Sequence, residues 1–335
     1  MDVGLIGAGR IGKIHAENIA HHLGRARLAR IADIAADPLR EWARGLGVEK
    51  VGTDYREVLE DPGIDAVVVT SSTDTHADLV VAAAERGKHV FCEKPIALTV
   101  PNVRRALAAV SRAGVKLQVG FNRRFDHNFS RVQKLVREGS IGQPQIVRIT
   151  SRDPAPPPPQ YVAVSGGIFL DMMIHDFDMA RFLSGSEVTE IFARGAVLID
   201  PAIGAAGDVD TAVVSLRFES GALGTIDNSR KCDYGYDQRV EVFGSKGSLA
   251  CSNDTPSSVV LSTTGGALAE KPLYFFLERY RQAFVDEMKS FVDAVLDGTP
   301  TPVNGNDGLA SLLLGLAAKK SLAEGRSVTV SEVAG

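Results

Sequence analysis

Two side chains that could move a proton lie four residues apart near the middle of the chain. Asp171 and His175 belong to segment 166–182, where apolar residues at helical spacing predict an amphipathic helix. On a helix, residues i and i+4 are neighbours on one face. A carboxylate beside an imidazole raises the proton affinity of the imidazole and orients the ring, as a general base near neutral pH requires. The alternative is an acid-rich helix N-terminus with an ordinary histidine.

A cation that could stabilise developing negative charge on a substrate oxygen lies far upstream. Glu93 and Lys94 directly follow the apolar segment 89–91, which is predicted to be a buried strand. Ligands of parallel α/β sheets bind beyond the carboxyl ends of the strands, so both side chains are predicted at the ligand site. The alternative is a surface ion pair.

A dinucleotide-binding motif opens the chain and supplies a reason for these groups to meet a ligand. Gly7, Gly9 and Gly12 form G-x-G-x-x-G between a predicted strand at 3–6 and a predicted helix at 11–22. A second predicted strand, 28–32, ends in Asp33. This is the full context of a dinucleotide site, with a tight turn, a helix N-terminus for the pyrophosphate and an acid for the ribose. Arg10 and Ile11, inside the motif, are predicted cofactor contacts as well.

Asp33 also indicates which cofactor binds. A carboxylate accepts hydrogen bonds from a ribose 2′-hydroxyl but repels a 2′-phosphate, and the following residues 34–36 include no arginine. We therefore predict NAD rather than NADP.

Alternating strands and helices extend the motif into a doubly wound parallel sheet. Strands are predicted at 66–69 and 116–119 and helices at 77–86 and 102–112. A polar segment follows the strand at 66–69, and we predict that its side chains contact the cofactor, the alternative being that they only cap the next helix. These residues are Thr70, Ser71, Ser72, Thr73 and His76.

The overall composition limits the architecture and the partners. A chain of 335 residues is predicted to form two domains. A net charge of -4 offers no basic surface for nucleic acid or anionic lipid. Three scattered cysteines suggest neither a disulfide framework nor a zinc site. The N-terminus does not resemble a signal peptide, and the longest apolar segment, 309–318, is too short to span a bilayer. These features predict a cytoplasmic protein that binds a small molecule.

With the glycine motif, Asp33, Glu93-Lys94-Pro95 and the Asp171/His175 pair in this order, the sequence resembles the Gfo/Idh/MocA oxidoreductase family. That family includes glucose-fructose oxidoreductase and inositol dehydrogenases. The resemblance covers essentially the whole chain and is greatest to bacterial inositol 2-dehydrogenases. It is carried there by segments 120–126, 151–154, 166–182 and 234–239. Ser72 departs from the pattern, because many members have a proline at this position.

The resemblance implies an α/β fold with two domains. An NAD-binding Rossmann domain, residues 1–120, is expected to precede a substrate-binding and oligomerisation domain, residues 121–335, with a large, open, mostly antiparallel sheet. The pattern of the second half agrees, with a predicted helix at 128–138 and strands at 145–150, 190–198, 211–218, 222–228, 239–243 and 248–251. Residues 154–159, nearly all proline, are predicted to form a stiff extended loop. Helices are predicted near 277–296 and 309–324. Family members are commonly homotetramers.

The predicted chemistry is oxidation of a secondary alcohol. His175 is assigned as the base, Asp171 as its orienting neighbour and Lys94 as the group that hydrogen-bonds the reacting oxygen. The resemblance implies the same three residues and also permits Lys94 as the final proton acceptor. A cyclitol presents hydroxyls around its ring, so polar side chains should line its pocket. We predict Asn122, Arg123, Asp153, Tyr234 and Tyr236 for this task, the alternative being solvated loop residues or sheet-packing tyrosines.

The resemblance implies that the reaction is NAD-dependent conversion of myo-inositol to 2-keto-myo-inositol. A dehydrogenase of another inositol isomer or sugar, and an NAD-dependent glycosidase on the same scaffold, remain as alternatives. A dinucleotide-sensing regulator without activity is disfavoured because the three catalytic residues are all present. A metal site formed by Asp171, His175 and Asp178 is also disfavoured, because hydride transfer to nicotinamide requires no metal. No metal is therefore predicted.

Overall fold

A computed structural model describes all 335 residues and divides them into two compact units. The first unit comprises Met1–Phe125 and Gln282–Leu312, and the second comprises Asp126–Arg281 and Leu313–Gly335. This division differs from the predicted boundary at residue 120, because helix α11 (Arg281–Leu296) lies almost wholly in the first unit. The physical reason is burial. The α11 side chains Met288, Phe291 and Val292 belong to the apolar core that also contains Val3, Leu5 and Val68 of the first sheet.

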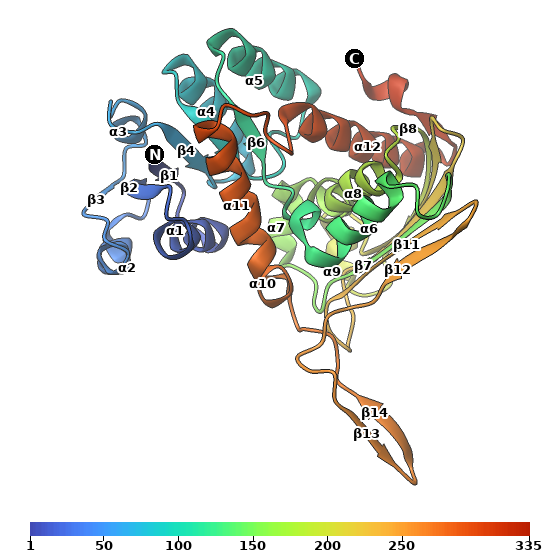
Figure 1. Ribbon diagram of the computed structural model, residues 1–335. Coiled ribbons are helices and arrows are strands. Elements are labelled where there is room, and N and C mark those ends of the chain that lie inside the picture. The colour runs from blue at the N-terminus through green and yellow to red at the C-terminus, as the bar shows by residue number, and fades with distance from the viewer. The chain divides into compact units, whose positions relative to one another are not determined.

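The first unit is built on a six-stranded parallel sheet (Figure 1). Its order is β3-β2-β1-β4-β5-β6, which reverses direction between β1 and β4 as in a doubly wound sheet. Continuous apolar runs such as that of β4, buried at every position, suit strands covered on both faces. The predicted doubly wound parallel sheet is confirmed. The strands are β1 (Asp2–Ile6), β2 (Arg27–Ala32), β3 (Lys50–Gly52), β4 (Ala66–Val69), β5 (His89–Cys92) and β6 (Leu117–Val119).

The predicted helices α1, α4 and α5 are present, with α4 and α5 beginning four and two residues earlier than predicted, and the short helices α2 and α3 were not predicted. Helix α4 begins at Thr73 rather than 77, because Thr73, Asp74 and Thr75 form its first turn after an extended Ser72. Short hydroxyl and acidic side chains are favoured at such helix starts. The helices are α1 (Arg10–His22), α2 (Arg40–Gly45), α3 (Arg56–Leu59), α4 (Thr73–Glu85), α5 (Val100–Ala113) and α11, with 3-10 turns η1 (Asp37–Leu39) and η2 (Asn122–Phe125).

The second unit contains the predicted large sheet, which has seven strands in the order β12-β11-β7-β10-β9-β8-β15. Only β7 and β10 pair in parallel among these neighbours, so the sheet is mostly antiparallel, as predicted. The predicted alternation in β9 is confirmed, since Val214, Leu216 and Phe218 are buried between exposed residues. The strands are β7 (Pro144–Arg152), β8 (Val188–Ala196), β9 (Thr211–Phe218), β10 (Leu223–Ser229), β11 (Asp237–Gly244), β12 (Gly247–Cys251) and β15 (Val328–Thr329).

Helices lie beside this sheet in Figure 1. Helices α6 (His127–Arg137) and α8 (Ile174–Ser184) contact each other, α8 contacts β7, and α6 contacts β12. The proline-rich segment ends where Pro159 begins the short helix α7 (Pro159–Ser165), a position that proline favours. The remaining elements are α9 (Pro201–Ala205), α10 (Phe276–Arg279), α12 (Gly305–Glu324), which continues from the first unit, and the 3-10 turn η4 (Val330–Val333).

The segment that carries Asp171 and His175 is not one helix, so that prediction is wrong. Residues Ile168–Met172 form a π-helical turn, η3, closed by a hydrogen bond of 2.8 Å from the Met173 amide to the Ile168 carbonyl. Asp171 lies in this turn and His175 is the second residue of α8. Gly167 enters the turn with a φ of 80°, and a Cβ there would lie 2.6 Å from Oδ1 of Asp208. Wide turns of this kind are frequent at functional sites.

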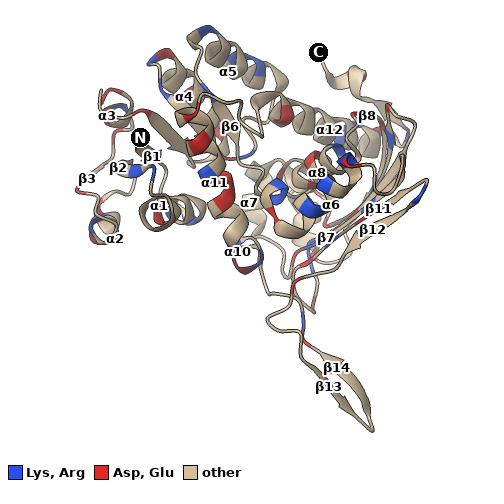
Figure 2. Ribbon diagram, viewed as in Figure 1, with Lys and Arg blue, Asp and Glu red and all other residues tan.

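One hairpin of the second unit is exposed along its whole length. Strands β13 (Val260–Thr263) and β14 (Gly266–Ala269) pair with each other, and every residue in them is exposed. Figure 2 shows that this hairpin carries no charged side chain, whereas acidic and basic residues are interspersed over the other elements. No helix in the structure combines the length and the apolar composition needed to cross a membrane.

Candidate active site

The glycine turn of the first unit has the backbone geometry of a phosphate-binding turn. Gly7 has a φ of 94°, and a Cβ there would lie 2.5 Å from the Ser71 amide nitrogen. A Cβ on Gly12 would lie 2.0 Å from the Gly7 carbonyl oxygen. A Cβ on Gly9, in contrast, would meet nothing within 4 Å. Gly7 and Gly12 are therefore required by packing, while Gly9 leaves open space at the start of α1, where Arg10 and Ile11 follow. These residues fit a dinucleotide pyrophosphate.

The side chains around this turn hold it in place. The Asp33 carboxylate, at the end of β2, accepts hydrogen bonds from the Ala8 amide at 2.6 Å and the Ala35 amide at 2.8 Å. The Thr70 hydroxyl donates to the Gly7 carbonyl oxygen at 2.5 Å. Each carboxylate oxygen has a second lone pair, so these bonds are compatible with the predicted contact between Asp33 and a ribose.

The remaining polar residues of this region link the loop after β4 to the segment after β5. The Ser71 hydroxyl shares a hydrogen bond of 2.6 Å with Thr75, within the first turn of α4. The buried His76 ring bridges the Ser71 carbonyl oxygen at 3.0 Å and the Pro95 carbonyl oxygen at 2.9 Å. Ser72 immediately precedes α4, and its carbonyl oxygen accepts hydrogen bonds from the Thr75 amide at 2.9 Å and the Thr75 hydroxyl at 2.7 Å. Thr73 is the first residue of the helix.

Lys94 lies in a segment whose backbone is held on several sides. The Glu93 amide continues the sheet by donating to the Val69 carbonyl oxygen at 2.9 Å. The Glu93 carboxylate accepts from the Lys94 amide at 3.2 Å and shares a 2.8 Å hydrogen bond with Nε2 of His15. A Cβ on Gly120 would lie 2.8 Å from this carboxylate, so the glycine is needed for the close approach. Lys94 itself is half-buried.

Asn122 and Arg123 are buried in η2, immediately beyond the last strand of the first sheet. They are therefore not the solvated loop residues of the alternative interpretation. Their neighbour Arg124 pairs with Asp307 of α12 at 2.9 Å, which anchors the turn within the first unit.

In the second unit, Asp171 is held by two side chains. The Tyr161 hydroxyl donates to Oδ1 at 2.9 Å, and Nη1 of Arg230 donates to Oδ2 at 3.2 Å. The same guanidinium nitrogen lies 4.0 Å from Oδ2 of Asp153. Arg230 thus brings together two residues, Asp171 and Asp153, that the sequence analysis assigned to the site separately.

Arg230 contacts two predicted site residues and was not itself predicted from the sequence. Its side chain is only 3% exposed, yet Nε and Nη2 are buried without a hydrogen-bond partner. Unsatisfied donors on a buried cation are costly, which suggests a ligand that accepts from them. Its place directly after β10 is the one sequence signal available, because burial of an arginine is not visible in a sequence.

His175 is positioned by its helix. The neighbouring residue Asp176 is fully buried and accepts a hydrogen bond of 2.8 Å from the Asn228 amide group of β10, which ties the start of α8 to the sheet. Asp208 accepts from the Ile168 amide at 2.8 Å and so supports the preceding turn. Burial raises the pKa of Asp208.

Asp178 belongs to the disfavoured alternative of a metal site with Asp171 and His175. Its carboxylate lies 3.9 Å from the Arg181 guanidinium.

The two predicted tyrosines have different surroundings. The Tyr234 hydroxyl donates to Asp237 at 2.6 Å and lies 3.2 Å from Nη1 of Arg152. Burial, followed by the hydrogen bond to Asp237, raises the pKa of Tyr234 to about 12. The Tyr236 ring is 5% exposed and makes edge contacts with Phe275 and Tyr280, as in the packing alternative.

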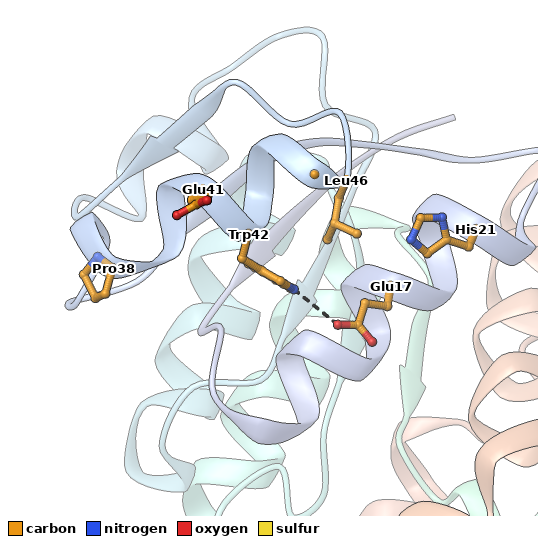
Figure 3. A pocket seen from close by; sticks show the side chains of 7 residues that line it. Glu17, His21, Pro38, Glu41, Trp42 and Leu46 are labelled. Atoms are coloured by element: carbon orange, nitrogen blue, oxygen red, sulfur yellow. Dashed lines mark hydrogen bonds between the residues drawn. The ribbon is translucent and has the colours of Figure 1, made fainter.

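A separate open pocket of about 620 Å³ lies between α1 and α2 (Figure 3). In it, Trp42 donates a 3.2 Å hydrogen bond to Glu17. No predicted site residue lines this pocket, which is formed by Glu17, His21, Pro38, Glu41, Trp42, Gly45 and Leu46.

Comparison with known proteins identifies both halves of the chain. Residues 1–121 match the family described as an oxidoreductase family with an NAD-binding Rossmann fold, and residues 129–250 match the GFO/IDH/MocA C-terminal domain. The chain is 56% identical over 335 residues to myo-inositol 2-dehydrogenase of Thermotoga maritima, covering 100% of both proteins.

Solved structures agree with this match. A crystal structure described as a probable dehydrogenase from Thermotoga maritima has a TM-score of 0.97 and 56% identity, with 99% of this chain and 100% of that chain covered. Scyllo-inositol dehydrogenase from Lactobacillus casei, solved with NAD(H) and scyllo-inositol, has a TM-score of 0.91 and 31% identity, with 99% of each chain covered. The resemblance stated from the motifs is confirmed.

Proposed function

This chain belongs to the Gfo/Idh/MocA oxidoreductase family, and we propose that it catalyses the NAD-dependent oxidation of a secondary alcohol of a cyclitol. The proposed substrate is myo-inositol, with 2-keto-myo-inositol as the product. The observation that carries this proposal is 56% identity over the full length to a protein named for that substrate. Scyllo-inositol is the second candidate, because a relative of the same fold was solved with it.

NAD is the proposed cofactor. The open backbone at Gly9 and the carboxylate of Asp33 at the end of β2 support it, as does the NAD(H) bound by the Lactobacillus casei relative. We propose that Gly7, Gly9, Gly12, Arg10 and Ile11 contact the pyrophosphate side. Asp33 contacts the adenosine ribose. The rest of the cofactor is contacted by the polar residues that follow β4 and β5, which are Thr70, Ser71, Ser72, Thr73, His76, Glu93 and Lys94.

The proposed mechanism assigns each catalytic residue one task. When bound, NAD supplies the nicotinamide carbon that accepts the hydride of the substrate C–H bond. His175 accepts the proton of the reacting hydroxyl. The Asp171 carboxylate orients the His175 ring and stabilises its positive charge. Lys94 hydrogen-bonds the same oxygen and stabilises the negative charge that develops on it. Asn122, Arg123, Asp153 and Tyr234 are proposed to bind the other hydroxyls, whereas Tyr236 packs against Phe275 and Tyr280.

Arg230 extends this proposal with a prediction. Arg230→Lys is expected to raise the KM for inositol about 10- to 100-fold, because a lysine retains the charge but lacks the planar guanidinium that can hold Asp171 through one nitrogen and donate to a substrate hydroxyl through another. Steady-state kinetics at saturating NAD measures the change. The matched control is Arg148→Gln, which removes an exposed arginine paired with Glu241 on the same sheet. An unchanged KM in Arg230→Lys would contradict the assignment.

A substrate screen tests the function itself. Purified protein with NAD should form NADH from myo-inositol or scyllo-inositol faster than from glucose, and NADP should be a poorer oxidant. Absorbance of the reduced nicotinamide measures this directly. Release of an aglycone from a glycoside without net NADH would instead identify the NAD-dependent glycosidase. NADH formation from none of the cyclitols or sugars would reject the proposal.

We further propose a homotetramer acting in the cytoplasm. The exposed, uncharged β13–β14 hairpin supports self-association, because an isolated two-stranded hairpin is only marginally stable in water. Its apolar residues Leu261 and Leu268 are 58% and 68% exposed, as contact surfaces often are. The three cysteines are free, as they would remain in a reducing compartment.

A further inference from the structure

Three ionisable side chains of the first unit meet in an apolar environment beside Lys94. His15 comes from α1, Glu93 follows β5, and Glu287 comes from α11. Nε2 of His15 lies 2.8 Å from Oε1 of Glu93 and 4.0 Å from Oε1 of Glu287. The side chains of His15 and Glu287 are fully buried, and that of Glu93 is 12% exposed. The rings of Phe91 and Phe284 contact the imidazole edge-on.

The charges in this cluster cannot all be present together. Two ionised carboxylates beside one imidazolium would leave a net negative charge in a low-dielectric environment, so one carboxyl group should keep its proton. The hydrogen bonds decide which one. Glu93 shares a hydrogen bond with His15 and accepts one from the Lys94 amide through different oxygens, whereas neither carboxyl oxygen of Glu287 has a hydrogen-bond partner. Burial, and then the charge of Glu93, raise the pKa of Glu287 well above its usual range.

The ionised member of the cluster acts directly on the backbone of the proposed catalytic lysine. Oε2 of Glu93 holds the Lys94 amide, while Oε1 is held in turn by His15. On the far side of Lys94, the His76 ring holds the Pro95 carbonyl oxygen at 2.9 Å. The backbone on both sides of Lys94 is therefore fixed by histidines from α1 and α4.

We propose that Glu93 and His15 are positioning residues for Lys94, with Glu93 ionised, and that Glu287 fills the rest of the cluster as a neutral acid with no part in catalysis. The role of Lys94 in this statement rests on the proposed function. The charge assignment within the cluster does not depend on it.

The same chemical change at the two glutamates separates their roles. Glu93→Gln should lower kcat about 100-fold, because glutamine has a single acceptor oxygen for two donors and misplaces the lysine backbone. The KM for NAD should change less than kcat, because the Glu93 carboxylate is bound to His15 and to the Lys94 amide. Glu287→Gln should leave kcat within about twofold of wild type, because an amide is close in shape to a neutral acid. Equal losses in the two variants, or an active Glu93→Gln, would overturn the proposal.

A second pair of variants tests the histidine. His15→Leu removes the donor to Glu93 and should lower kcat in the same way as Glu93→Gln. His15→Gln restores an N–H group near the position of Nε2 and should recover part of the lost kcat. If His15 were only structural, His15→Leu and His15→Gln would lose stability equally and His15→Gln would recover no kcat. Thermal melting of the same two proteins measures the stability losses.

Stability against pH tests the charge assignment even if no substrate is found. The titratable groups that face Glu287 are His15 from α1 and Glu93 from the end of β5, and the nearby Gln118 of β6 is uncharged. The folded protein keeps a proton on Glu287 that the unfolded chain releases above the ordinary value of 4.5. This contribution to stability is complete below that pH and is lost as pH rises through the folded-state pKa. Glu287→Gln should remove this dependence and melt no lower than wild type at neutral pH.

A bound metal ion is the competing explanation for why His15, Glu93 and Glu287 lie together, because their ligand atoms are close enough to surround one. A metal would require both carboxylates ionised. Elemental analysis after dialysis against a chelator should therefore find less than stoichiometric metal, with kcat and melting temperature unchanged. A stoichiometric metal that Glu287→Gln abolishes would overturn the neutral assignment. Failure of every cyclitol to react would instead reject the proposed function and leave the melting and metal results to judge the cluster.

Discussion

Lys94→Ala is expected to lower kcat/KM for inositol about 10³-fold while the affinity for NADH changes little. The lysine is the proposed donor to the reacting oxygen, and loss of a group that stabilises developing charge in the transition state carries an effect of this size. The backbone at this position is held by Glu93 and His76 and should survive the change. Initial rates and fluorescence titration with NADH measure the two quantities.

The control for this variant is Lys50→Ala, which removes an exposed lysine of β3 in the same sheet. It should keep wild-type kinetics. A Lys94→Ala protein that loses NADH affinity as strongly as it loses kcat/KM would show that the lysine serves cofactor binding instead.

His175→Gln is expected to lower kcat by about 10² to 10⁴-fold, the usual contribution of a general base. The pH profile adds a sharper test. A base must be deprotonated to act, so kcat/KM of the wild type should fall toward acidic pH, and the variant should lose that acidic limb. Initial rates across a pH series measure both.

His127→Gln is the matched control, because His127 is the first residue of α6 and its side chain is 69% exposed. Near-wild-type kcat in His175→Gln would mean that the base assignment is wrong. A slow variant that keeps the acidic limb would assign the final proton acceptance to Lys94, the alternative that the family resemblance permits.

Features that depend on neighbouring residues could be read from the sequence. The strand Ala66–Val69 and the strand Thr211–Phe218 were predicted at the residues where they occur. Apolar runs and apolar alternation are set by which faces of a strand are buried, and this repeats every one or two residues. The glycine motif is similar, since the lack of space at Gly7 and Gly12 arises within one strand–turn–helix unit.

Features that depend on distant residues could not be read in this way. The π-helical turn that separates Asp171 from α8 is supported by Asp208, forty residues away. Arg230 reaches Asp171 across 59 residues, and Glu287 reaches His15 from the other end of the chain. Each of these side chains is polar and appears in the sequence as an ordinary surface residue.

The sequence by itself therefore determined the family, the two kinds of sheet, and the types of residue that could carry hydride-transfer chemistry, because these follow from motifs and short periodicities. Tertiary structure alone decided which carboxyl groups are buried beside His15, which arginine joins Asp153 to Asp171, and which unit contains α11. The physical reason is that burial and hydrogen-bond partners come from chain segments that only folding brings together, and these determine the charge and orientation of a side chain.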